Sequence, residues 1–109
     1  MRTSSPLAAV AFALSLAPSA YAAGDAVAGK GVFDAQCMAC HTIVAGKNGF
    51  GPSLAGVIGR KSGALAGYTY SQAMANAGLT WDAKTIDEFI AASTTKVPGT
   101  AMQVSVTDA

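Results

Sequence analysis

The chain has 109 residues with seven basic and six acidic side chains, so its formal net charge is +1 and it lacks the basic excess typical of nucleic-acid binding. A chain of this length forms a single small domain that buries only a modest fraction of its surface. Because so small a domain has little core of its own, we expect a further stabilising element in the fold.

A cleaved leader is predicted at the N-terminus. Arg2 is followed by a mostly apolar run, Leu7–Leu16, and then by the small-residue sequence Ala20-Tyr21-Ala22. A basic end, an apolar stretch and an A-x-A site are typical of a secretory signal peptide, here residues 1–22. We expect export to the periplasm and a mature domain over residues 23–109, with an uncleaved amphipathic anchor as the alternative. No later stretch approaches the roughly 20 apolar residues of a membrane helix, so we expect no stable membrane insertion after cleavage.

Charge in the mature chain is balanced. Removing the 22-residue leader from 109 residues leaves 87, and Arg2 is the one charged residue that leaves with it. Six basic and six acidic side chains remain. We therefore expect no nucleic-acid partner and no strong electrostatic steering to a charged surface.

The first element of the mature chain is expected to be a helix that leads into a five-residue motif. Asp25 is a suitable N-cap, and Phe33 and Cys37 lie four residues apart on one helical face. The motif itself is Cys37-Met38-Ala39-Cys40-His41, which uses both cysteines and the single histidine of the chain.

A Cys-x-x-Cys-His motif is typical of covalent haem c attachment. On a helical turn this spacing lets both thiols add across the two vinyl groups of one porphyrin, and His41 then becomes the proximal iron ligand. A disulfide and a thioredoxin-type redox dithiol are the alternatives, although the latter expects a strand before the motif. Zinc would need about four ligands, which one histidine and two cysteines do not supply.

The segment after the motif is expected to be a loop. Seven glycines lie between Thr42 and Gly67, without the periodicity of a long helix or a strand. A carbonyl group of the Gly51–Pro52 turn is expected to accept the second ring proton of His41 and so orient the imidazole.

Two helices are expected next. Ser71 can cap a short helix that Gly78 ends, and Asp82 can cap a second helix. In the second helix Ile86, Phe89 and Ile90 form an apolar stripe at i, i+3 and i+4, which we expect to belong to the core.

The second axial ligand of the iron is expected to be a methionine. Pro98 and Gly99 predict a turn that can hold Met102 against the distal face. Met74 remains the alternative, although its place in a predicted helix suits core packing equally well. A histidine and a methionine close both axial positions and favour electron transfer over ligand chemistry.

These residues resemble class I cytochrome c, particularly the mitochondrial-like and cytochrome c2 branch, along nearly the whole mature chain. The resemblance rests on the haem motif Cys37–His41, on Gly51-Pro52-Ser53-Leu54 with Gly59-Arg60, on Gly67-Tyr68-Thr69-Tyr70 through Trp81, and on Pro98-Gly99-Thr100-Ala101-Met102. It implies an all-α fold of short helices and glycine-rich loops around one covalent haem c. It also implies a carrier of single electrons, not an enzyme, working between a cytochrome c reductase and an oxidase or reaction centre.

Carried over by position, the resemblance implies a role for each site residue. Cys37 and Cys40 would hold the porphyrin and His41 and Met102 the iron. The Pro52 carbonyl would orient His41, while Arg60, Tyr70, Trp81 and Thr100 would surround the haem propionates.

The chain departs from the family pattern in three ways. Met74 stands where the family commonly has a polar amide, and Phe89 where it often has a tyrosine, so hydrogen bonds near the methionine sulfur are expected to be absent. The lysines that commonly ring the haem edge are largely replaced by Thr94, Thr95 and Ala101, which weakens the case for an electrostatic partner interface. The family's final helix is expected to be missing, because the chain ends at Thr107–Ala109, and a fragment or a covering partner chain would account for this.

Three rival functions remain open at this stage. An open-site haem protein would bind peroxide or a diatomic gas where Met102 does not reach the iron. A thiol-disulfide protein would carry no haem. A non-functional truncation is the third.

Overall fold

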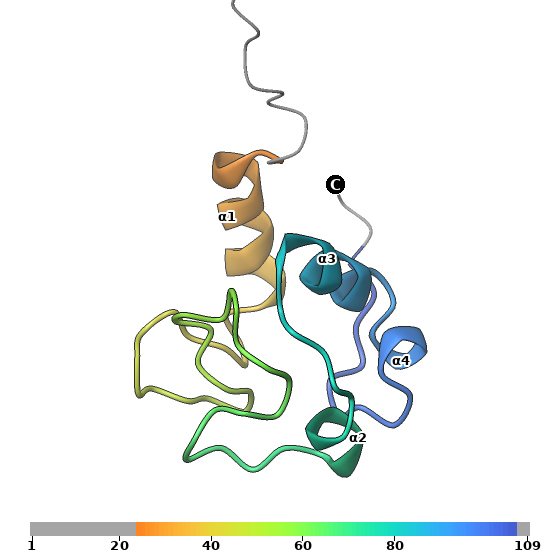
Figure 1. Ribbon diagram of the computed structural model, residues 1–109. Helices are drawn as coiled ribbons and strands as arrows, with labels where there is room; N and C mark the ends of the chain where they lie inside the picture. Colours follow the sequence, from red (N-terminus) through yellow and green to blue (C-terminus); the bar gives the residue numbers. More distant parts are fainter. Residues whose placement is uncertain (1–23, 107–109) are drawn as a thin grey trace, which may run out of the picture.

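The computed structural model describes residues 24–106, where four helices and long loops form a fold without β-strands (Figure 1). The all-α architecture expected from the sequence is therefore confirmed. The predicted signal peptide and residues 107–109, where the expected final helix would begin, lie outside the described residues.

Helix α1, Ala26–Gln36, begins at the cap expected from the sequence. The Asp25 carboxylate accepts hydrogen bonds from the backbone N–H groups of Val27 and Ala28, at 3.0 and 3.1 Å. This satisfies two of the N–H groups that a helix leaves unpaired at its start. No residue of α1 is buried, so the helix contributes nothing to the buried core of the described residues.

The segment from residue 42 to residue 70 forms the predicted loop and contains no helix (Figure 1). An isolated antiparallel bridge between Lys61 and Thr80 ties it to the chain before α3. Beside the bridge, the Ser62 hydroxyl accepts the Leu79 N–H at 3.0 Å, and the Leu79 carbonyl accepts the Ser62 N–H at 2.8 Å. The loop is thus fixed at its middle as well as at its ends.

Helix α2, Gln72–Ala75, is a single turn capped by Ser71, whose hydroxyl accepts the Met74 N–H at 3.1 Å. It ends before the predicted stop at Gly78, because Asn76 already leaves the helical conformation with φ −99° and ψ 0°. Met74 is its one buried residue.

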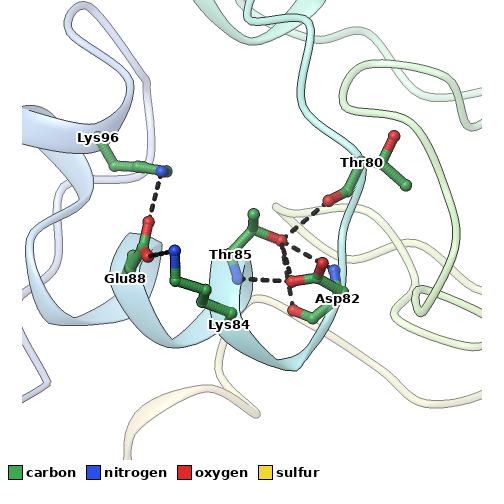
Figure 2. Close-up of polar contacts among 6 residues, drawn as sticks. All are labelled: Thr80, Asp82, Lys84, Thr85, Glu88 and Lys96. Carbon is green, nitrogen blue, oxygen red and sulfur yellow. Dashed lines mark hydrogen bonds and ion pairs between the residues drawn. The ribbon is translucent and has the colours of Figure 1, made fainter.

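Helix α3, Ala83–Ala91, begins at the predicted cap with a reciprocal arrangement that Figure 2 shows. The Asp82 carboxylate accepts the Thr85 N–H at 2.8 Å, and the Thr85 hydroxyl oxygen accepts the Asp82 N–H at 2.8 Å. Farther along the same helix, Glu88 pairs with Lys84 at 3.2 Å and with Lys96 at 2.5 Å. Lys96 belongs to the next helix, so this carboxylate joins two elements.

Helix α4, Ser93–Lys96, was not predicted from the sequence. Ala92 separates it from α3 with an extended φ of −154°, and Ser-Thr-Thr is a weak helix-forming sequence. Contacts outside the helix compensate: Ser93 is fully buried, and Lys96 reaches back to Glu88. The predicted turn follows, closed by a hydrogen bond from Thr100 N–H to the Val97 carbonyl at 3.0 Å, with Gly99 at φ +87°.

The apolar core of the described residues is small. Its buried members are Met74, Trp81, Phe89 and Val97, and the Trp81 and Phe89 rings meet at a centroid distance of 5.2 Å. Ile86 and Ile90 pack against this cluster, so the predicted apolar stripe of α3 does belong to the core. Within residues 24–106, no helix is both long and apolar enough to cross a membrane.

We predict that the Asp82 cap makes stability depend on acid pH. The Thr85 N–H and then the Thr85 hydroxyl hold the pKa of Asp82 below its ordinary value of 3.8. Stability from this group is therefore present above pH 3.8 and is lost as the pH falls through the lower folded-state pKa. Asp82→Asn keeps an acceptor oxygen but not the charge, so it should be less stable than wild type at neutral pH and equally stable in strong acid.

Chemical unfolding of the holoprotein, followed by circular dichroism between neutral pH and strong acid, measures this difference. Asp82→Ala is the matched control, since it lacks the acceptor oxygen and should stay less stable than wild type throughout. A constant difference between Asp82→Asn and wild type would contradict the prediction.

Candidate functional site

A cavity of about 680 Å³ lies between α1, the loop, α3 and the segment after the Pro98–Gly99 turn. Much of its wall is apolar, with Val32, Phe33, Leu54 and Ile86 among the lining residues. The structure brings all nine residues singled out from the sequence to this one cavity: Cys37, Cys40, His41, Pro52, Arg60, Tyr70, Trp81, Thr100 and Met102.

The motif lies on a turn that continues α1. The N–H groups of Cys40 and His41 both donate to the Cys37 carbonyl, at 3.1 and 3.0 Å. The bond to His41 has the i to i+4 spacing of an α-helix, so the two thiols and the imidazole are presented by one helical turn. This is the arrangement expected for two thiols that bond to the same porphyrin ring.

His41 is buried, with 9 % of its surface exposed, and its orientation is fixed. Its Nδ1 lies 2.8 Å from the Pro52 carbonyl oxygen. Because a carbonyl oxygen can only accept, this contact places a proton on Nδ1, and in the neutral imidazole the lone pair then lies on Nε2. Neutral imidazole in this tautomer is the form that binds a metal ion.

Gly51 explains how the Pro52 carbonyl can approach the ring. A Cβ atom on Gly51 would lie 2.7 Å from Nδ1 and 2.8 Å from Nε2 of His41, far inside van der Waals contact. Glycine is therefore needed here for space, because the backbone passes directly against the imidazole.

Both thiols are free in the structure, with Cys37 half-buried and Cys40 exposed. Burial raises the pKa of the Cys37 thiol above its ordinary value of 9.0, so this group is protonated at neutral pH. Redox-active dithiols instead lower the pKa of the attacking thiol, and they follow a strand where this motif follows a helix. The geometry therefore disfavours the thioredoxin-type alternative.

Arg60 and Tyr70 line the cavity with donors that the protein only partly uses. The Arg60 guanidinium donates to the carbonyl oxygens of Ser53 at 2.9 Å and Ala55 at 2.5 Å, which leaves other N–H groups of the fork free. The Tyr70 hydroxyl oxygen accepts the Leu65 N–H at 3.3 Å, so its own proton is available to a further acceptor.

Trp81 and Thr100 are buried, with 8 % and 3 % of their surfaces exposed. Trp81 lines the cavity, and none of the side-chain hydrogen bonds among the described residues involves its indole N–H. The Thr100 hydroxyl oxygen accepts the Met102 N–H at 3.2 Å and keeps its own proton to donate. Four polar side chains thus offer unused donors to one cavity, as an anionic group such as a carboxylate requires.

Met102 and Met74 differ in their surroundings. Both methionines line the large cavity, but Met74 belongs to the buried core cluster, whereas Met102 is half-buried and packs against that cluster. Met102 also lines a second, smaller cavity of about 70 Å³ together with Cys37, Cys40 and His41. This placement favours Met102 over Met74 as the residue whose sulfur serves the site.

The sequence analysis singled out neither Phe50 nor Ser93. Phe50 lines the cavity and is 87 % exposed, and Ser93, which does not line it, bonds to Val104 two residues beyond Met102. An exposed aromatic residue in a glycine-rich loop was the available signal for Phe50. Ser93 carried no signal, because its partner lies 11 residues away.

These residues fit a haem c group. The cavity is large and much of its wall is apolar, and it is lined by two thiols, an imidazole and side chains with unused donors for carboxylates. Zinc fits less well, since no group of three or more His, Cys, Asp or Glu side chains gathers in the part of the chain that the structure describes.

Comparison with known proteins agrees with this fit. The family model "Cytochrome c" matches residues 26–105. The chain is 56 % identical to cytochrome c2 of Rhodoblastus acidophilus over 73 % of this chain and 75 % of that protein. It is 46 % identical to cytochrome c2 of Rhodomicrobium vannielii over 88 % of this chain and 77 % of that one. The solved structure of cytochrome cH from Methylobacterium extorquens superposes with a TM-score of 0.71 at 45 % identity, covering 78 % of this chain and 86 % of that one.

The fold and the site define a class I cytochrome c, a monohaem protein that carries electrons. The chain belongs to the cytochrome c family, in its cytochrome c2 branch, and its Cys-x-x-Cys-His motif binds one covalent haem c.

We predict that Gly51→Ala disrupts the site, because the added methyl group would overlap the His41 ring. Overpacking of this kind costs about 1–3 kcal/mol of stability, and here it also displaces the imidazole. The yield of covalent haem protein and its unfolding free energy measure the effect. Gly31→Ala is the matched control, since a Cβ there meets nothing within 4 Å. Wild-type stability and spectrum in Gly51→Ala would contradict the prediction.

Proposed function

We propose that Cys37 and Cys40 form the thioether bonds of the haem, and that His41 and Met102 are the two axial ligands of its iron. The observation that carries the proposal is the meeting of both thiols, His41 and Met102 at one cavity, although Met102 is far from the motif in sequence. The 2.8 Å contact between His41 Nδ1 and Pro52 supports the axial role, because it leaves Nε2 free for a metal.

The bound haem supplies a reversible one-electron couple between ferric and ferrous iron. His41 and Met102 would hold the iron from positions that the chain's own hydrogen bonds fix. His41 is fixed by Pro52, and the backbone of Met102 is fixed by Thr100. A thioether ligand favours the ferrous state, and apolar side chains such as Phe33 and Ile90 exclude water from the site.

Arg60, Tyr70, Trp81 and Thr100 are proposed to bind the two haem propionates. Each offers a donor that the rest of the described chain leaves free or shares. Three of the four are neutral and Arg60 is charged, so the set can hydrogen-bond two carboxylates and partly neutralise them.

The setting of this activity is also a proposal. We infer a signal peptide over residues 1–22, a mature domain over 23–109 and a place in the periplasm as a soluble carrier. The partners would be a cytochrome c reductase on one side and an oxidase or reaction centre on the other. No substrate bond would be made or broken, so the protein would not be an enzyme.

We predict that Met102→Leu opens the iron to external ligands while Met74→Leu does not. Both changes keep side-chain volume and remove a sulfur atom, at a stability cost below about 1.5 kcal/mol. The measurement is the absorption spectrum of the ferrous holoprotein with and without carbon monoxide. Wild type and Met74→Leu should ignore carbon monoxide, and Met102→Leu should bind it.

Rapid carbon monoxide binding by the wild type would contradict the proposed ligation. It would support instead an open-site protein that binds peroxide or a diatomic gas. Binding by Met74→Leu alone would assign the second axial position to Met74.

We predict that electron transfer with a reductase depends only weakly on salt. The proposed mature chain has six basic and six acidic side chains, and no lysine of the described residues lines the cavity. Steered association falls steeply with ionic strength, by factors of about 10 or more, whereas we expect a change within roughly threefold. Stopped-flow rates between low and physiological salt measure it, and a steep decline would contradict the balanced-charge interface.

A further inference from the structure

The five residues that begin with Met102 form one wall of the site. Along this segment half-buried and exposed residues alternate: Met102, Val104 and Val106 are half-buried, and Gln103 and Ser105 are exposed. All three half-buried side chains line the smaller cavity beside His41, and Met102 and Val106 also line the large one. The segment therefore presents every second side chain to the site, as an extended chain does.

Because inward and outward side chains alternate along residues 102–106, the direction of the Met102 side chain depends on the register in which this segment packs. A slip of one residue would turn every inward side chain outward, and Gln103 would take the place of Met102. Nothing in the side chain of Met102 itself prevents this, because Met102 is flexible and only half-buried. Some other contact must set the register.

Ser93 makes that contact. Its hydroxyl accepts the Val104 N–H at 2.8 Å and donates to the Val104 carbonyl at 3.0 Å, while the Ser93 N–H donates to the same carbonyl at 3.3 Å. Ser93 is the first residue of α4 and has 0 % of its surface exposed. Both backbone groups of a single residue are thus held by one buried serine.

The other hydrogen bonds of this segment each hold only one backbone group of a residue. Val106 N–H donates to the Ile90 carbonyl at 2.8 Å, and the exposed Ser105 hydroxyl donates to the Ala91 carbonyl at 3.0 Å. On the other side of Met102, the Thr100 hydroxyl oxygen accepts the Met102 N–H at 3.2 Å. Ser93 is the one of these side chains that is both fully buried and bonded to the donor and the acceptor of the same residue.

We propose that Ser93 is a positioning residue for the axial ligand: by holding Val104 it fixes the register of residues 102–106 and so directs the Met102 sulfur into the site. The inference rests on the proposed function, since it takes Met102 to be the ligand. Loss of the hydroxyl leaves the Val104 N–H without its partner and the Val104 carbonyl with only the Ser93 N–H at 3.3 Å, so the segment is held more weakly and can leave with Met102.

The test compares Ser93→Ala, Ser93→Thr and Ser62→Ala holoproteins. Ser93→Ala should bind carbon monoxide in the ferrous state at least about tenfold faster than wild type, because the hydrogen bonds lost are each worth roughly 1 kcal/mol. Ser93→Thr keeps the hydroxyl and should bind it near the wild-type rate. Ser62→Ala removes another buried hydroxyl bonded to backbone, at Leu79, and should lower stability without opening the iron.

Hydrogen exchange of the wild-type holoprotein provides a second test that needs no variant. The Val104 N–H should exchange through the same opening that admits carbon monoxide, so the two opening equilibria should agree within about threefold. Exchange much slower than carbon monoxide entry would show that Met102 leaves while Val104 stays bound, and would overturn the inference. Wild-type carbon monoxide binding in Ser93→Ala would overturn it as well.

The two proposals fail in different ways. If Met102→Leu behaves like wild type, Met102 is not the ligand and the proposed function fails. If Met102→Leu binds carbon monoxide and Ser93→Ala does not, the ligation stands and only the role of Ser93 is wrong.

Discussion

The structure depends on a cavity that takes the place of a core. Four apolar side chains are buried in the described residues, and α1 contributes none of them. Many of the remaining apolar side chains, including Val32, Phe33 and Leu54, line a space of about 680 Å³. Since a small domain has little stability to spare, the group that fills this space supplies much of the hydrophobic burial on which the fold relies. Covalent attachment at the Cys-x-x-Cys-His motif, directly after α1, then keeps that group in place.

Local signals in the sequence predicted the helix starts well. Asp25, Ser71 and Asp82 all cap the helices expected of them, because a capping side chain acts within three residues of itself. The apolar stripe of α3 was equally local. Helix α4 was missed, because Ser-Thr-Thr has weak propensity and the contacts that hold it, to Val104 and Glu88, come from outside the segment.

The residues of the site were likewise predictable from the sequence only in part. The spacing of the Cys37–His41 motif was enough to predict haem c, because covalent haem attachment needs two thiols and an imidazole on one turn. Arg60, Tyr70 and Trp81 carried no such signal, and only the resemblance to cytochrome c singled them out. The structure brings them to the same cavity, but which acceptor each serves is set by long-range packing that no local pattern encodes.

Buried hydroxyl and imidazole groups replace apolar packing in securing the loops. The buried polar side chains are His41, Ser53, Ser62, Ser93 and Thr100, and each is bonded to a backbone group of a loop or turn. Such bonds are directional, and breaking one leaves a buried group unsatisfied, so they hold a loop in one position more strictly than apolar contact does. Electron transfer is favoured when the loops that carry the iron ligands are held in one position. A ligand held in the same place before and after the iron changes charge has little to rearrange, and the protein dipoles around it are already oriented. Two of the hydrogen bonds that compensate for a small core, that of His41 with Pro52 and that of Thr100 with Met102, also act on the two residues proposed to bind the iron.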